Sequence, residues 1–321
     1  MNDIVKNKCG INFMISPQIE LLSVIQIMTN ELDGKYKEFY TNNEYYVSKV
    51  KNYFKDYINH PAITNYRNFY VYNSQIINYS FLNDKLVLDN SNIEDKYKEY
   101  IDQLNDFITK SNFNIFFNDM KDYYNGVLDY NLNNINNLHI SDNLSDFYNT
   151  KININVILKI IQSDWGEYLS NIDNTFTILC GTNSNDKYPL FINPIQLSSL
   201  CFHECTHPFV NKYITSDYDL LAKSEKIYLD LDENSIARKE YYTYNSYLED
   251  LIVRAITAYM HYKYGYKNKD EYKDELLAMK KMGFDCIEDI ANIIETNNFY
   301  TSVDLIKKYL LNKSLISFKP R

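Results

Sequence analysis

Two histidines and a glutamate in the segment HECTH, residues 203–207, have the pattern HExxH. If this segment is helical, residues four apart lie one above the other, because a helical turn takes 3.6 residues. The imidazoles of His203 and His207 can then both reach one zinc ion at about 2.0–2.1 Å. Glu204 lies about 100° around the helix from His203 and can act as a base on a water molecule. The spacing therefore predicts a zinc site with Glu204 as its general base.

The residues around the motif predict where its helix begins and ends. Asn193-Pro194 has the composition of an N-cap followed by the first helical residue. Pro208 lacks the N–H that would bond the carbonyl of Glu204, and it disfavours helical geometry at His207. We therefore expect the helix to end or kink at His207.

A catalytic zinc usually has three protein ligands and one open position, so a third ligand is needed. No histidine follows His207 at the spacing HExxHxxGxxH, but a helix predicted at about residues 234–264 carries Glu249 and Asp250. Glu249 falls among apolar residues of that helix, where an uncompensated carboxylate would cost on the order of several kcal/mol. Asp250 falls on a polar stripe and can pair with Arg254. We predict Glu249 as the third ligand, with Asp250 as the alternative.

Other polar residues are expected to support the site rather than bind the metal. Arg254 and His261 share the polar stripe of Asp250 and are expected to stabilise charge beside the ligands. An oxyanion of the substrate would be stabilised by His261 or by a tyrosine. The chain has 32 tyrosines, so composition does not single one out.

Charge and hydropathy exclude several classes of partner. The formal net charge of the 321-residue chain is -9, which argues against nucleic acid as a partner. The chain lacks a run of about 18 apolar residues, so we expect no membrane span. The apolar stretch at residues 11–28 is interrupted by polar residues and is unlike a signal peptide. We expect a cytoplasmic protein, or a secreted one if an N-terminal signal has been removed; the oligomeric state is not indicated.

Hydrophobic periodicity predicts a predominantly helical α+β protein. Residues 1–140 are expected to form a helical part packed on a catalytic core at residues 141–321, or one continuous domain with it. Residues 175–180 and 188–192 are expected to form a hairpin beside the motif helix, and residues 152–161 favour a helix. The strand at 175–180 is expected to bind an extended peptide by strand addition.

Several short segments between residues 15 and 260 occur in a recognisable order. They are ELLS from Glu20, the stretch from Tyr53-Phe54 to His60-Pro61-Ala62, the aromatic series Phe113, Phe117 and Tyr123-Tyr124, the HExxH motif, and Val253-Arg254-Ala255. In this order they resemble an uncharacterised bacterial domain family of HExxH metalloproteases of the glutamate-zincin type. The resemblance implies a zincin-like core, His203 and His207 as zinc ligands, Glu204 as general base, and an acidic ligand on the helix of Arg254. Pro208 departs from the small or polar residue expected there.

The sequence as a whole predicts a zinc metallopeptidase that acts on a peptide or protein substrate. Two alternatives use the same residues: a zinc hydrolase of a small amide or ester, and a non-catalytic zinc-binding or interaction module. The residues that would bind the substrate are not indicated.

Overall fold

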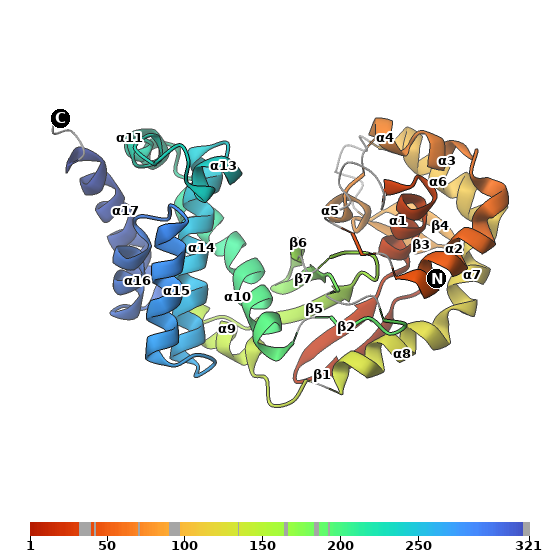
Figure 1. Ribbon diagram of the computed structural model, residues 1–321, viewed down its shortest axis with the longest axis horizontal. Coiled ribbons are helices and arrows are strands. Elements are labelled where there is room, and N and C mark those ends of the chain that lie inside the picture. The colour runs from red at the N-terminus through yellow and green to blue at the C-terminus, as the bar shows by residue number, and fades with distance from the viewer. Residues whose placement is uncertain are drawn as a thin grey trace. The chain divides into compact units, whose positions relative to one another are not determined.

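The computed structural model describes residues 1–31, 40–41, 43–69, 71–89, 97–133, 135–163, 166–182, 186–191 and 193–316. Helices dominate, and they accompany a five-stranded mixed sheet and a two-stranded hairpin (Figure 1). The predicted α+β class with predominant helix is confirmed. The chain forms two compact units, one of Met1–Ser141 with Ile152–Leu197 and the other of Asp142–Lys151 with Ser198–Arg321. The predicted division near residue 140 remains a prediction.

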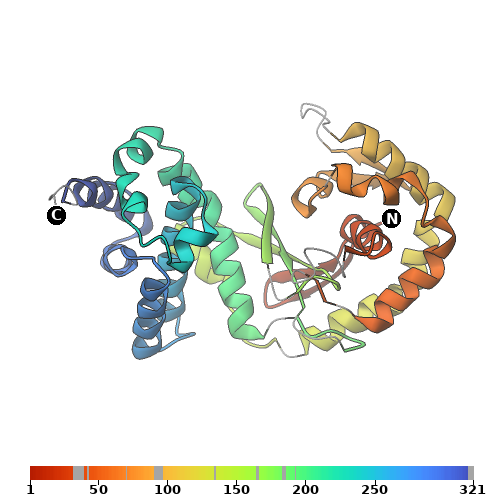
Figure 2. The same ribbon diagram turned by 45° about the horizontal axis from the view of Figure 1, so that its top comes forward.

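The first unit is built on the mixed sheet. Its strands are β1 (Ile4–Lys8), β2 (Ile11–Ile15), β5 (Asn153–Leu158), β6 (Gly166–Ile172) and β7 (Thr175–Cys180), in the spatial order β1-β2-β5-β7-β6. The three inner strands are parallel, and each outer strand is antiparallel to its neighbour. Figure 2 shows β1 and β2, from the start of the chain, beside strands from its middle.

Tight turns explain the strands that periodicity does not predict. Cys9 and Gly10, with φ of 53° and 76°, connect β1 to β2, and Asp173 and Asn174, with φ of 49° and 57°, connect β6 to β7. Positive φ at both central residues matches the twist of a two-residue hairpin. A further hairpin joins β3 (Tyr79–Leu82) to β4 (Lys85–Leu88). The expectation that the first 140 residues are all helical is therefore wrong.

Strand β5 corrects the helix expected at residues 152–161. It pairs in parallel with β2 and β7, and its apolar residues are buried, including Ile154 and Val156. Its apolar run is the short Val156-Ile157-Leu158, and periodicity alone does not distinguish such a run from part of a buried helix.

Strand β7 forms as predicted but with a different partner. It pairs with β6 rather than with residues 188–192; of the latter, Phe191 makes a single bridge to Thr182, and Ile192 lies outside the described residues. Because β5 and β6 occupy both of its edges, β7 has no edge for a peptide substrate. The expected strand addition at residues 175–180 is wrong.

The helices of the first unit pack through aromatic side chains. Phe54 contacts the rings of Phe107, Phe113 and Phe116, with ring centroids 4.9–6.5 Å apart. These segments also carry part of the family resemblance, and here they form core. The helices are α1 (Pro17–Met28), α2 (Glu44–Phe54), a 3-10 turn (Lys55–Tyr57), α3 (Pro61–Thr64), α4 (Tyr66–Phe69), α5 (Asn73–Ile76), α6 (Lys98–Ser111), α7 (Phe113–Asp119) and α8 (Lys121–Leu132).

The second unit is helical. The helices α14 and α16 pack together, and α15 packs on both (Figure 1). The elements of this part of the chain are α9 (Ile140–Tyr148), α10 (Pro194–Val210), a π-helix (Asn211–Thr215), α11 (Tyr218–Ser224), α12 (Lys226–Leu229), α13 (Ile236–Glu240), α14 (Tyr244–Lys263), α15 (Lys269–Lys281), α16 (Ile287–Glu295) and α17 (Phe299–Ile316). None of the described helices is both long and apolar enough to traverse a bilayer.

One long helix was expected over residues 234–264, but the structure has two separate helices there, α13 and α14. Helix α13 ends at Glu240, and Thr243 caps α14 by accepting a hydrogen bond from the backbone N–H of Ser246. Helix α13 is also joined to the end of α15, because the N–H of Ala237 donates to the carbonyl of Met282 at 2.8 Å. Gly283 follows with φ of 107°, and a Cβ there would lie 2.8 Å from the side chain of Ser235. This close approach requires glycine.

The side chain of Asn131 fixes the segment that leads into α10. From α8 it donates to the carbonyl of Pro189 at 2.9 Å and accepts from the N–H of Phe191 at 2.7 Å, and it is buried. We predict that Asn131→Leu lowers the free energy of unfolding by about 2–4 kcal/mol, because two buried backbone groups lose their partner. Asn125→Leu, at a less buried position of the same helix, should change it by about 0.5 kcal/mol or less. Urea denaturation measures both, and equal losses would contradict the assignment.

Candidate metal centre

Helix α10 carries the HExxH motif and begins where the sequence predicts. Asn193 accepts hydrogen bonds from the N–H groups of Ile195 and Gln196, both at 3.0 Å, and Pro194 is the first helical residue. This is the expected N-cap arrangement.

The helix does not end at His207. It continues through Pro208 to Val210 and passes into the π-helix Asn211–Thr215. A proline inside a helix costs about 3 kcal/mol, and burial after it opposes that loss. The ring of Phe209 stacks on Tyr148 with centroids 3.8 Å apart, and Val210 is fully buried. His207 therefore lies within a continuous helix, not at its end.

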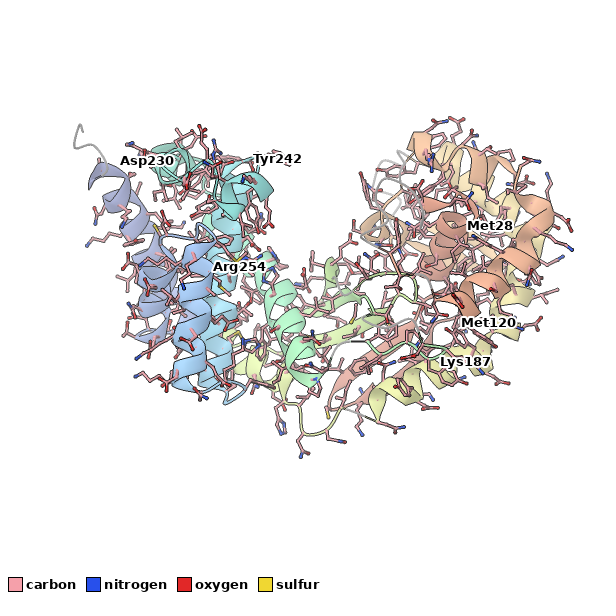
Figure 3. The ribbon with its side chains drawn as sticks, in the orientation of Figure 1. Met28, Met120, Lys187, Asp230, Tyr242 and Arg254 are labelled. Carbon is pink, nitrogen blue, oxygen red and sulfur yellow. The ribbon has the colours of Figure 1, made fainter. Side chains whose placement is uncertain are left out.

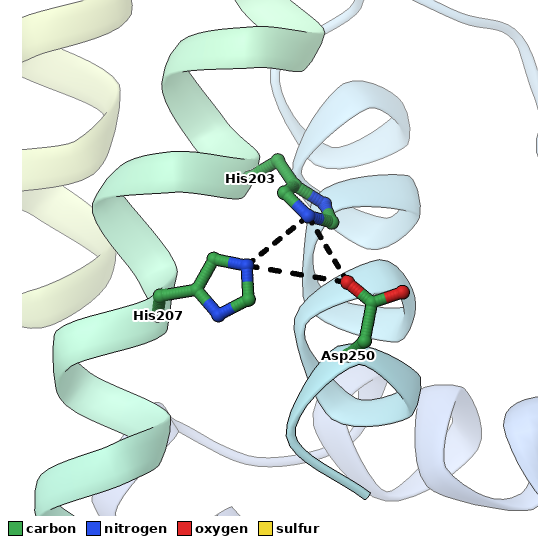
Figure 4. Close-up of side chains that lie close together, drawn as sticks. All are labelled: His203, His207 and Asp250. Atoms are coloured by element: carbon green, nitrogen blue, oxygen red, sulfur yellow. Dashed lines mark hydrogen bonds and ion pairs between the residues drawn. The ribbon is translucent and has the colours of Figure 1, made fainter. Parts of the chain in front are cut away.

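Three side chains converge between α10 and α14 (Figure 4). The Nε2 atoms of His203 and His207 are 3.2 Å apart. Asp250 Oδ1 lies 3.1 Å from Nε2 of His203 and 4.0 Å from Nε2 of His207. The three distances, 3.1–4.0 Å, are close to the separation of about 3.3 Å between ligand atoms that lie about 2.0–2.1 Å from one tetrahedral metal ion.

The two helices run antiparallel along this contact. Ser199 lies near His261, His203 near Asp250, and His207 near Glu249, so residue numbers rise on α10 as they fall on α14. The polar stripe that the sequence shows on α14 faces α10.

Glu249 contacts the other nitrogen of His207. Its Oε1 lies 2.8 Å from His207 Nδ1, and Thr215 of the π-helix donates its hydroxyl to Oε2 at 3.4 Å. A carboxylate on Nδ1 holds the proton there and leaves the Nε2 lone pair available. Asp250, the predicted alternative, therefore lies in the convergent group, whereas Glu249, the predicted third ligand, contacts one of its histidines from the other side.

Asp250 is fixed as a carboxylate. Both Tyr241 and Arg254 donate hydrogen bonds to its Oδ2, which leaves Oδ1 toward the histidines. Burial alone would raise the pKa of Asp250, but His203 and Arg254 hold it well below its usual range. Burial and the charge of Asp250 raise the pKa of Tyr241, which therefore remains a donor.

The charges of the group fit a divalent cation. Burial alone would lower the pKa of His207, yet the hydrogen bond to Glu249 and the charges of Glu204, Glu249 and Asp250 raise it overall. The position between the carboxylates thus favours positive charge. Two imidazoles and a carboxylate are also a known donor set of catalytic zinc.

Glu204 faces the space beside this group. With His203 and Arg254 it lines a cavity of about 250 Å³. Figure 3 labels Arg254, which comes from α14. Glu204 follows His203 in the chain, and its side chain is expected to point about 100° around the helix from that histidine. In the structure Glu204 lines the cavity and is not part of the convergent group. A carboxylate there can exchange a proton with a molecule held in the cavity.

His261 has a different environment from the one expected. It is fully buried, and its Nε2 lies 3.3 Å and 3.2 Å from the hydroxyls of Ser198 and Ser199. Burial lowers its pKa to about 4, so the imidazole is neutral near pH 7. It does not supply a positive charge to the site.

Sequence reasoning misses Tyr241 and Thr215. Tyr241 lies between α13 and α14, where the sequence predicts an uninterrupted helix and not a connecting segment. Thr215 reaches Glu249 because the chain continues as a π-helix past Pro208. A polar stripe on an otherwise apolar α14 was the available signal for Asp250 and Arg254.

Fold and site together define an α+β protein with a two-histidine, one-carboxylate group that can hold a metal ion. The chain belongs to the family described as "Domain of unknown function (DUF4932)", whose model matches residues 82–305. That range contains the motif and both carboxylates of α14. No curated protein and no solved structure matches the chain.

Substitution separates the roles of the two acidic residues. We predict that Asp250→Asn weakens zinc binding by about 100-fold or more, because a ligand charge is lost. Glu249→Gln should weaken it by only about 10-fold, because the amide still bonds His207 Nδ1. Asp230→Asn, which changes an exposed carboxylate paired with Lys226, should leave the affinity unchanged. Competition with a chromophoric chelator measures each Kd, and the reverse order would make Glu249 the ligand.

Proposed function

We propose that this protein is a zinc-dependent hydrolase that cleaves peptide bonds, with Glu204 as general base. The observation that carries the proposal is the convergence of His203, His207 and Asp250, with His203 and Glu204 on the wall of one cavity. A partly buried group of two imidazoles and a carboxylate is a donor set suited to a divalent cation, and a base one residue from a ligand is suited to hydrolysis. The zincin-like core inferred from sequence is part of this proposal.

Residues that hydrogen-bond the candidate ligands also support zinc binding. Glu249 holds the proton of His207 on Nδ1, and Tyr241 with Arg254 fixes the rotation of the Asp250 carboxylate. Such contacts set the orientation and basicity of metal ligands. Zinc, when bound, would acidify water and polarise the carbonyl of the scissile bond.

The chain's own residues account for the proton movements. Glu204 takes a proton from the attacking water and later gives it to the leaving amine nitrogen, so it returns to a carboxylate after each turnover. Arg254 lines the same cavity while it binds Asp250. Its guanidinium is placed to stabilise negative charge on the carbonyl oxygen of the substrate.

The resemblance to HExxH metalloproteases favours a peptide bond as the target. The same residues would also hydrolyse a small amide or ester, because the reacting groups are alike. The substrate therefore decides between these two classes, and a screen must contain both.

A peptide-library digest with the variant Glu204→Gln tests the proposal. We expect the wild-type protein to cleave peptides and Glu204→Gln to lower kcat/KM by about 100- to 10,000-fold, because the base is lost while the ligands remain. Zinc content, measured by mass spectrometry, should be equal in the two proteins. Glu240→Gln, an exposed residue at the end of α13, is the matched control and should retain activity.

Two outcomes would overturn this function. If wild type and Glu204→Gln hold zinc and give identical digests, the base assignment fails. If only small amides or esters react, the protein is a hydrolase of those compounds instead.

A further inference from the structure

The cavity beside the metal-binding group extends along two helices, away from His207. Ser199 and Leu200, one turn before His203 on α10, line it. Thr257 lines it from α14, and Glu275 and Met279 line it from α15. The space thus begins at His203 and Glu204 and continues between three helices, where a side chain next to a scissile bond would enter.

The walls suit a long side chain with an aliphatic stem. Leu200 and Met279 contribute apolar surface from opposite helices, α10 and α15. A methionine can adjust its rotamer to an unbranched chain. The volume of about 250 Å³ is that of a pocket for a single side chain and not for a folded segment.

Two polar groups on the cavity wall can each accept a further hydrogen bond. Thr257 is 6% exposed, and its Oγ1 lacks a hydrogen-bond partner among the described residues. The same holds for Oε2 of Glu275 within the described part of the chain. A carboxylate only accepts, and a buried acceptor without a donor is unfavourable by about 1–3 kcal/mol. The Glu275 carboxylate therefore needs a donor, and the Thr257 hydroxyl can accept a hydrogen bond from the same group.

The charges favour a cation over an anion. Glu204 and Glu275 line the cavity, and Arg254, which lines it too, already binds Asp250. Lys267 pairs with Oε1 of Glu275 at 2.9 Å but does not line the cavity. This pair leaves Oε2 of Glu275 for a second cation, with its attraction weakened by Lys267.

We infer that this cavity is the subsite for a lysine or arginine side chain next to the cleaved bond. The aliphatic stem packs between Leu200 and Met279, and the cationic head binds Glu275 and Thr257. The position next to a cleaved bond rests on the proposed function; the binding of a cationic side chain does not.

Binding measured without turnover tests the subsite. Wild-type protein is treated with a chelator, and calorimetry gives the Kd of a blocked tripeptide with central lysine and of the same peptide with norleucine. Norleucine keeps the stem and lacks the ammonium group. We expect lysine to bind about tenfold more tightly, because only the ammonium satisfies the buried acceptors.

Two variants should move this preference in opposite directions. Glu275→Gln should reduce the lysine preference to about twofold or less, because the charge is removed. Lys267→Met should increase it by several fold, at about the same norleucine affinity, because Glu275 loses its competing partner. Asp274→Asn, an exposed neighbour on α15, is the control and should match wild type. Circular dichroism verifies the fold of each protein.

The outcomes separate this inference from the proposed function. Equal affinities for lysine and norleucine, or a lysine preference that survives in Glu275→Gln, overturn the subsite. If the lysine peptide binds as expected but no peptide is cleaved, the inference about the subsite stands and the proposed peptidase function fails. Cleavage by wild type without preference for basic residues retains the peptidase and removes the subsite.

Discussion

The contact between α10 and α14 is the interaction on which the site depends. These antiparallel helices place two histidines against two consecutive acidic residues, and each acidic residue takes a different nitrogen. Consecutive helical residues point about 100° apart, so Glu249 and Asp250 reach two sides of one imidazole pair. Buried carboxylates of this kind are stable only with compensating charge and donors. Arg254, Tyr241 and the histidines supply part of that compensation, and the second unit is arranged to provide them.

The sequence predicts that two histidines of one helix meet a carboxylate of α14, but it does not predict which carboxylate joins them. The i,i+4 spacing of His203 and His207 needs only a helix, and the N-cap at Asn193 favours one. The choice between Glu249 and Asp250 depends on which face of α14 meets α10. Helix α14 is buried over most of its circumference, so an apolar neighbourhood does not mark the face of the site. Its polar stripe does, because a buried helix has few other uses for Asp250, Arg254 and Thr257.

The errors in the fold arise from contacts distant in sequence. Strand β5 contains a short apolar run that also fits a buried helix, and it pairs with β2, which is far away in the chain. The turns at Cys9-Gly10 and Asp173-Asn174 decide two hairpins with two residues each. At Pro208 a strong local signal predicts a helix end, but the helix continues because Phe209 stacks on Tyr148 and Val210 is fully buried. Tertiary packing overrides local preference at β5 and at Pro208, whereas the two hairpins depend on their own turn residues.

The backbone hydrogen bond between α13 and the end of α15 connects the segment of Tyr241, which binds Asp250, with residues that line the cavity. The backbone bond from Ala237 to Met282 and the glycine at 283 fasten the segment that presents Tyr241 to the helix that carries Glu275 and Met279. A side chain that enters the cavity and displaces α15 therefore also strains the donor that fixes Asp250. Under the two proposals, any change that an occupant of the cavity makes to the metal affinity equals the change that the metal makes to the affinity for that occupant. A substitution of Gly283 would act on both at once from outside the site.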